Sequence, residues 1–188
     1  MIGQVETIQI SVISNSTNYL TYEGLPWIVL AWIGLFFFRP FATLTHEIGH
    51  LIPALLLTKN EVSIRVGEQG SKWKGRFLDI IWEFNFKNGN EGFTGYDKKL
   101  LTKMTHGVII VGGLISSFMM SLTTAYFLFN FKHSTGVEII LVSWFCANAL
   151  TFMRALIPVK LKPTKCFPDG PESDGMELKK LLFDKKIN

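Results

Sequence analysis

Residues 41–57 read FATLTHEIGHLIPALLL, an apolar run whose only ionisable side chains are His46, Glu47 and His50. The two histidines are four positions apart, so on a helix both imidazoles project from one face, close enough to bind one metal ion. Glu47 flanks that face. Zn²⁺ is usually bound in a tetrahedron, and a carboxylate beside a zinc-activated water can accept its proton as general base. The spacing therefore indicates metal-assisted hydrolysis, with Zn²⁺ as the expected cofactor.

The setting of this motif strengthens the metal interpretation. A Glu and two His in an apolar run cost several kcal/mol to bury unless they are paired, and ionisable groups inside membrane spans usually mark functional sites. The alternative is a hydrogen-bonded cluster at a helix end that binds no metal.

The composition is that of a small membrane protein. The chain has 188 residues, of which 48% are hydrophobic and 16 are Phe, which is too apolar for one ordinary soluble domain. The net charge of +4 is distributed unevenly along the chain, which indicates membrane topology and predicts no nucleic-acid partner. Two cysteines, Cys146 and Cys166, predict no disulfide framework and no cysteine-bound metal. The first residues lack a basic region, so no signal peptide is expected.

The apolar segments predict a mainly α membrane protein with about three transmembrane helices, a lead-in helix and a small cytoplasmic β-hairpin or sheet. The first apolar segment, residues 26–57, would form a helix of about 48 Å, longer than a hydrocarbon core of about 30 Å. Either residues 27–38 lie at the interface as a lead-in helix, or one long helix is kinked at Pro40. Residues 107–129 and 137–159 predict the second and third spans.

Polar and small residues inside the later spans have specific predicted roles. Gly112-Gly113 and Ser116-Ser117 form a small-residue face on which another helix can pack closely. Asn148 is a candidate substrate-binding residue, which could equally bind a neighbouring helix or a zinc ligand. Arg154 lies near the end of its span and is expected to be structural, with its charged end reaching the interface.

Between the first two spans, residues 60–97 predict a β insertion. Residues 62–66 and 78–86 alternate between apolar and polar side chains, and the Gly-rich segment 67–75 between them predicts a hairpin-like unit. Residues 92–95 predict a turn or a third short strand. Two functions are open for this unit: a solvated cap on the membrane domain, or a sheet whose edge pairs with an extended substrate.

The charge pattern predicts the orientation. The chain divides into an exposed leader at residues 1–24, a membrane core at 25–159 that carries the β insertion, and a tail at 160–188 with an Asp-Gly motif and a short helix. The leader has no Lys or Arg and the loop 130–136 has only Lys132, whereas the β insertion and the tail hold most of the others. By the positive-inside rule the N-terminus is outside and the tail is cytoplasmic, in an integral protein of the cell membrane.

Together these features resemble the site-2 protease family of intramembrane zinc metalloproteases, and the chain looks like a small, minimal-core member. The matching features are THEIGHL in an early span, a strand region after it, a Gly-rich second span, and LIP at residues 156–158 followed by Asp-Gly. The resemblance implies that His46 and His50 are zinc ligands, that Glu47 is the general base, and that an Asp-Gly aspartate is the third ligand.

Two Asp-Gly pairs follow the third span, so the third ligand has two candidates. Asp174 is favoured because Ser173 and Gly175 flank it and Met176 and Leu178 follow, as in the small-subtype version of the motif that opens a final helix. Asp169 is the alternative. It stands between Pro168 and Gly170-Pro171, a pattern that is typical of a plain turn.

The resemblance implies hydrolysis of peptide bonds in or near transmembrane segments of membrane proteins or membrane-anchored peptides. The lipid bilayer is a further expected partner, and a homo-oligomer or a regulatory membrane partner stays open. The alternative function is a catalytically inactive relative that binds transmembrane partners, although such a protein would have no need of Glu47. A transporter with a transition-metal site would require further ligands within the spans.

Overall fold

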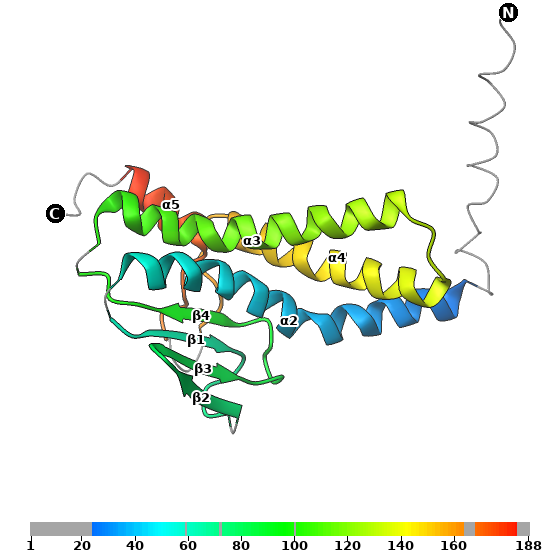
Figure 1. Cartoon of the computed structure of the whole chain (residues 1–188), viewed down its shortest axis with the longest axis horizontal. Helices are drawn as coiled ribbons and strands as arrows, with labels where there is room; N and C mark the ends of the chain where they lie inside the picture. The colour runs from blue at the N-terminus through cyan, green and yellow to red at the C-terminus, as the bar shows by residue number, and fades with distance from the viewer. Residues whose placement is uncertain (1–23, 59, 72, 100, 164–167, 184–188) are drawn as a thin grey trace, which may run out of the picture.

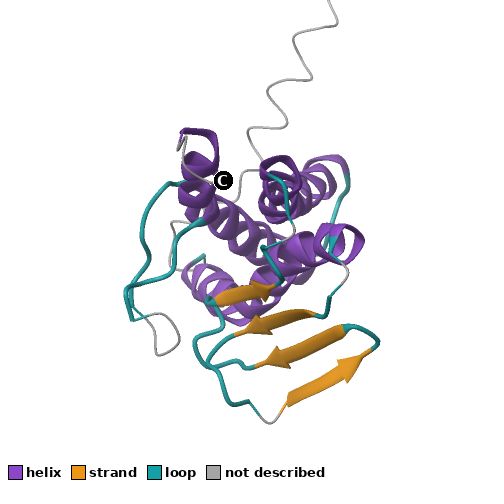
Figure 2. Ribbon diagram, turned by 90° about the vertical axis from the view of Figure 1, so that its left-hand side faces the viewer, coloured by secondary structure: helices purple, strands orange, loops and turns teal. Residues whose placement is uncertain are grey.

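Four helices and a four-stranded sheet make up the described part of the chain. This part comprises residues 24–183 except 59, 72, 100 and 164–167 in the computed structural model. The leader predicted for residues 1–24 thus lies almost entirely outside the described residues, as does Cys166. In chain order the elements are α2 (Leu25–Leu57), β1 (Val62–Val66), β2 (Trp73–Phe77), β3 (Ile80–Phe84), β4 (Gly92–Gly95), α3 (Lys103–Asn130), α4 (Thr135–Leu156) and α5 (Asp174–Phe183). The sheet and α5 lie toward the same end of the three long helices (Figures 1 and 2).

Three long apolar helices lie where the sequence predicted apolar segments, although the third ends at Leu156 and not at residue 159. At about 1.5 Å per residue, α2, α3 and α4 extend about 50, 42 and 33 Å, and a hydrocarbon core is about 30 Å thick. Each is long and apolar enough to cross a membrane. Their outward faces are apolar as well, since Trp32, Phe36 and Ile115 are each more than half exposed. Such a surface suits lipid better than water.

The first apolar segment forms one helix, so the predicted lead-in at residues 27–38 is not a separate element. Pro40 and Pro53 both lie inside α2. A proline inside a helix removes one backbone hydrogen bond and pushes on the preceding turn, which bends the helix without necessarily ending it. The axis of α2 is visibly bent in Figure 1. Of the two predicted arrangements, the single kinked helix is the one found.

The sheet has the strand order β2-β3-β1-β4, which makes the predicted hairpin wrong in its pairing. β1 runs parallel to β3, and the hairpin partner of β3 is β2, which lies within and just beyond the segment predicted as a connection. Gly75 belongs to the segment that was predicted as a connection, but it lies in strand β2 and is paired with Trp82 of β3. A Cβ at Gly75 would lie 2.8 Å from the Trp82 ring, so the glycine makes room for the indole.

Short strand β4 forms the edge of the sheet beside α2. It pairs antiparallel with β1, so of the two alternatives predicted for residues 92–95, a turn or a third short strand, the strand is the one found. The sheet and the helices share one hydrophobic core, to which α2, β1 and α3 contribute Leu51, Ala54, Val62, Ile64 and Ile109. This core holds the edge strand β4 next to the motif-bearing segment of α2.

The small-residue face predicted on the second span packs against α2. A Cβ at Gly49 would lie 2.4 Å from the carbonyl oxygen of Gly112, and a Cβ at Gly112 would lie 2.2 Å from that of Gly49. The Ser116 hydroxyl donates a hydrogen bond of 2.8 Å to the Thr45 carbonyl. Backbones can approach this closely only where side chains are absent or small. The close approach brings α3 directly behind the two histidines.

After α4 the chain turns back so that α5 packs against α3 and α4, and its first residue faces the histidines of α2. Ser173 is buried, its backbone N–H donates to the Val159 carbonyl at 3.1 Å, and its hydroxyl donates to the Ile157 carbonyl at 2.7 Å. A Cβ at Gly175 would lie 2.0 Å from the Leu156 carbonyl oxygen, so only glycine fits there. The predicted final helix is confirmed, and its first residue is Asp174.

Candidate metal centre

His46, Glu47 and His50 lie on the inner face of α2, and each is at most 7% exposed. The Nε2 atoms of His46 and His50 are 3.1 Å apart, as the four-residue spacing on a helix predicts. Both rings are therefore directed at one point.

Asp174 reaches this point from α5, more than 120 positions along the chain. Its Oδ2 atom lies 2.9 Å from His46 Nε2 and 3.2 Å from His50 Nε2. Asp169 is exposed, and it is not part of the group of potential ligands that His46, His50 and Asp174 form. Of the two Asp-Gly aspartates, the fold brings Asp174 to the histidines.

The three ligand atoms form a triangle of the size that a zinc ion requires. Its edges are 2.9, 3.1 and 3.2 Å. Zinc bonds of about 2.0–2.1 Å in a tetrahedron separate neighbouring ligand atoms by about 3.3 Å, so a shift of a few tenths of an ångström would fit the set to the ion. Two imidazoles and one carboxylate are also a donor set that catalytic zinc sites use, with the fourth position open.

Hydrogen bonds behind the histidines orient both rings. His50 Nδ1 lies 2.8 Å from the carbonyl oxygen of Ile109, which can only accept, so Nδ1 carries the proton and donates it. In the neutral ring, Nε2 then presents a lone pair to the centre. His46 Nδ1 lies 2.9 Å from the hydroxyl of Ser117, which is fully buried. Such outer partners are typical of metal-binding histidines.

The electrostatics of the centre keep the Asp174 carboxylate ionised. Burial alone would raise the pKa of Asp174, but the adjacent imidazoles of His46 and His50 hold it well below its ordinary value. Nearby Tyr96 shows the opposite effect, because burial, followed by the carboxylates around it, raises the pKa of its phenol. An ionised carboxylate between two imidazole lone pairs is suited to bind a divalent cation.

Glu47 is held by the edge strand of the sheet. The hydroxyl of Thr94 in β4 donates to Glu47 Oε2 at 2.6 Å, and a Cβ at Gly92 would lie 2.1 Å from Glu47 Oε1. A hydrogen bond to one carboxylate oxygen fixes the side chain and leaves the other oxygen to accept a proton. Glycine at position 92 gives that second oxygen its space.

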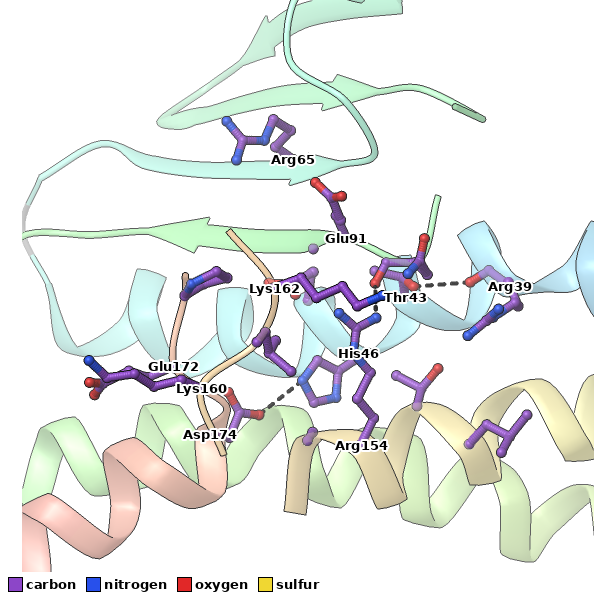
Figure 3. A pocket seen from close by; sticks show the side chains of 18 of the residues that line it. Arg39, Thr43, His46, Arg65, Glu91, Arg154, Lys160, Lys162, Glu172 and Asp174 are labelled. Carbon is purple, nitrogen blue, oxygen red and sulfur yellow. Dashed lines mark hydrogen bonds and ion pairs between the residues drawn. The ribbon is translucent and has the colours of Figure 1, made fainter. Parts of the chain in front are cut away.

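A cavity of about 540 Å³ opens onto the centre. Thr43, His46, Glu47 and Asp174 line one part of it, and residues of α4, the sheet with the loop before β4, and the segment before α5 line most of the rest (Figure 3). His50 lies behind His46 and is not part of the lining. The centre is therefore buried in the protein on one side and open to a ligand on the other.

Two polar residues of α4, Asn148 and Arg154, lie in different surroundings. Asn148 is fully buried, donates to the Trp144 carbonyl at 2.9 Å and does not line the cavity, so the fold does not bring it to the substrate space. Arg154 does line the cavity and donates to the Asn90 carbonyl at 2.7 Å. The sequence position of Arg154 did not predict that it lines a cavity, because the residues it faces there belong to the loop before β4, which is distant in sequence.

Gly113 gives a direct test of how closely α3 supports the centre. A Cβ at this position would lie 2.2 Å from His50 Nε2, so Gly113→Ala must displace the imidazole. Loss of ligand support of this kind usually costs about 10–100-fold in metal affinity, and we expect a loss of at least about 10-fold. Zinc competition against a chelating dye measures it. Gly107→Ala is the matched control, since its Cβ would meet nothing within 4 Å on the same helix. Equal affinities of both variants would contradict the geometry.

No protein-family model, curated protein or solved structure matches this chain. The site itself therefore carries the functional assignment.

Proposed function

We propose that this protein is an integral-membrane zinc endopeptidase that cleaves peptide bonds in or near transmembrane segments, similar to site-2 proteases. The observation that carries the proposal is the meeting of His46, His50 and Asp174 within 3.2 Å of one another, beside Glu47 and a cavity. A binding protein would not require a carboxylate positioned next to the ligand triangle. A protease that uses an activated water does.

Each residue of the site has a defined task in this proposal. His46, His50 and Asp174 hold the metal. Zinc supplies a Lewis acid for the scissile carbonyl and lowers the pKa of the attacking water. Glu47 accepts the proton of that water at Oε1 and passes it to the leaving amine, while Thr94 keeps Oε2 in place.

The cavity provides the route by which a peptide reaches these groups. Its lining includes Gly92 of β4, which is the edge strand of the sheet. An extended substrate segment that enters the cavity would therefore come within reach of this edge strand. Edge pairing would hold the peptide extended, which is the conformation that exposes a scissile bond to a water molecule.

The experiment that tests the proposal combines metal content with cleavage. We expect detergent-purified protein to hold about one zinc per chain, because the site has one complete ligand set. It should cleave single-span model peptides reconstituted with it, and a chelator should stop cleavage until zinc is restored. Zinc binding without cleavage of any peptide in such a set would support the non-catalytic alternative that binds transmembrane partners.

The charge distribution supports an orientation in which the sheet and tail face the cytoplasm. Lys132 lies in the α3–α4 loop, at the end of the helices away from α5, whereas Arg76 belongs to the basic β insertion (Figure 1). Both side chains are exposed. In a chain without its native cysteines, an impermeant thiol reagent should label Lys132→Cys in intact cells and Arg76→Cys only after permeabilisation. The reverse pattern would invert the proposed topology.

A further inference from the structure

Basic side chains dominate the part of the cavity away from the metal centre. Arg39, Arg154, Lys160 and Lys162 all line it, and Figure 3 shows them around the space beside His46. The centre requires no such charge, because a divalent cation bound there would balance its own carboxylates.

Arg39 is a partly buried member of this group. It lies seven residues before His46 on α2, which is two helical turns along the same face. Within the described residues its guanidinium has no hydrogen bond or ion pair, although the side chain is only partly exposed. A partly buried guanidinium without a protein acceptor is unfavourable to the extent that its N–H donors lose contact with water.

Arg154 brings a second guanidinium to the same space from α4. One of its nitrogens donates to the Asn90 carbonyl, which fixes the side chain across the cavity. The like charges of Arg39 and Arg154 repel each other, and Glu91 is the acidic group that attracts Arg154. Two guanidiniums thus face one protein carboxylate at this point.

The remaining acidic residue of the outer cavity does not restore the balance. Glu172 forms an ion pair with Lys180, which brings its own positive charge and does not line the cavity. The outer cavity is therefore electropositive. Because the space is enclosed on several sides by protein, its field acts strongly on an anion that enters it.

We propose that Arg39 and Arg154 bind a carboxylate of the substrate, so that the enzyme prefers peptides with an acidic side chain or a free C-terminus beside the scissile bond. This inference rests on the proposed peptidase function. Guanidinium groups bind carboxylates through paired, charge-assisted hydrogen bonds, which fix direction as well as position. A peptide held in this way would place its neighbouring peptide bond over His46 and Glu47, which line the same cavity.

The test measures binding in the zinc-loaded Glu47→Gln protein, in which turnover is blocked. Two fluorescent single-span peptides are compared by anisotropy in a neutral detergent, identical except that one carries Asp and the other Asn in the flank. Hydrogen bonds to charged groups predict about tenfold tighter binding of the Asp peptide. Added salt should reduce this difference.

Substitutions of Arg39 test whether the preference for the Asp peptide arises in the cavity. Arg39→Gln in the same background should reduce the Asp preference to less than about twofold, because the carboxylate loses its unpaired partner. Arg76→Gln is the matched control: it removes an exposed arginine of β2 that does not line the cavity, and the preference should stay. Arg39→Glu should instead favour a peptide with Lys in the flank, which a merely unfolded variant could not do. Zinc content verifies the fold of each protein.

Equal binding of the Asp and Asn peptides, or no binding of either to zinc-loaded protein, would overturn the inference. Phosphatidylglycerol and phosphatidylcholine are compared as competitors, because a lipid phosphate offers similar chemistry. If phosphatidylglycerol binds through Arg39 while no Asp preference exists, the cavity binds lipid and the inference is wrong. The protein with native Glu47 could also prefer the Asp peptide and yet cleave no peptide. That outcome would support the carboxylate site and contradict the peptidase function.

Discussion

Replacing Glu47 by Gln is expected to abolish peptide cleavage and to leave zinc bound. Gln keeps the size of Glu and can still accept the hydrogen bond that Thr94 donates to Oε2. It cannot accept a proton at Oε1, so only the base is lost. General-base catalysis contributes about 10²–10⁴-fold, and we expect a fall in kcat of at least about 10²-fold.

The measurement is the initial cleavage rate of a model single-span peptide at saturating concentration, with zinc content determined on the same sample. Glu138→Gln is the matched control, because Glu138 lies in the first turn of α4, outside the cavity. Full activity of the Glu47→Gln protein would remove Glu47 from the mechanism. Loss of zinc would show that Glu47 acts on the metal site and not as a base.

The sequence predicted the parts of the fold that depend on neighbours along the chain. Apolar runs gave the three long helices, and the spacing of His46 and His50 gave two ligands on one face, because helical geometry is local. Ser173-Asp174-Gly175 indicated the start of a final helix, which the structure confirms. Its Ser173 hydroxyl lies 3.2 Å from the Met176 backbone N–H, as in a helix cap.

The sheet pairing depended on contacts that are distant in sequence. Gly75 is in strand β2 because Trp82 covers it, yet in the sequence a glycine between polar residues indicates a turn. Parallel pairing of β1 with β3 is also invisible locally, since alternation says which face a residue occupies and not which strand is its neighbour. The predicted hairpin failed at both points.

The residues that position the site residues could not be predicted from the sequence either. Thr94 and Gly92 lie next to Glu47 only because the edge strand packs against α2. Arg39 and Arg154 come close enough to repel each other only because α4 packs against α2. Gly113 was predicted as a packing residue, and its more specific task of leaving room for the His50 ring requires the depth of the α2–α3 contact. Motif spacing identifies ligands, whereas the groups that position them come from the tertiary fold.

Asp174→Ala is expected to remove zinc from the protein, and Asp169→Ala is expected to retain it. Asp174 contributes the only carboxylate of the ligand triangle, with Oδ2 at 2.9 and 3.2 Å from the two histidine Nε2 atoms. Changes to outer partners of metal ligands cost about 10–100-fold in affinity, so loss of a ligand itself should exceed about 100-fold. Asp169 is a matched control, since it precedes a glycine in the same tail but is exposed and outside the group.

Zinc affinity by dye competition, with circular dichroism to verify the helices, separates the two variants. Asp174→Asn refines the result: its amide keeps the shape of the side chain and Ser173 still supports the start of α5, but the negative charge is absent. If charge matters, zinc affinity falls in Asp174→Asn as well as in Asp174→Ala. Zinc retained by both Asp174 variants and lost from Asp169→Ala would move the third ligand to Asp169. That outcome would require α5 to leave its place beside the histidines, because Asp174 now occupies the position that any third ligand must take.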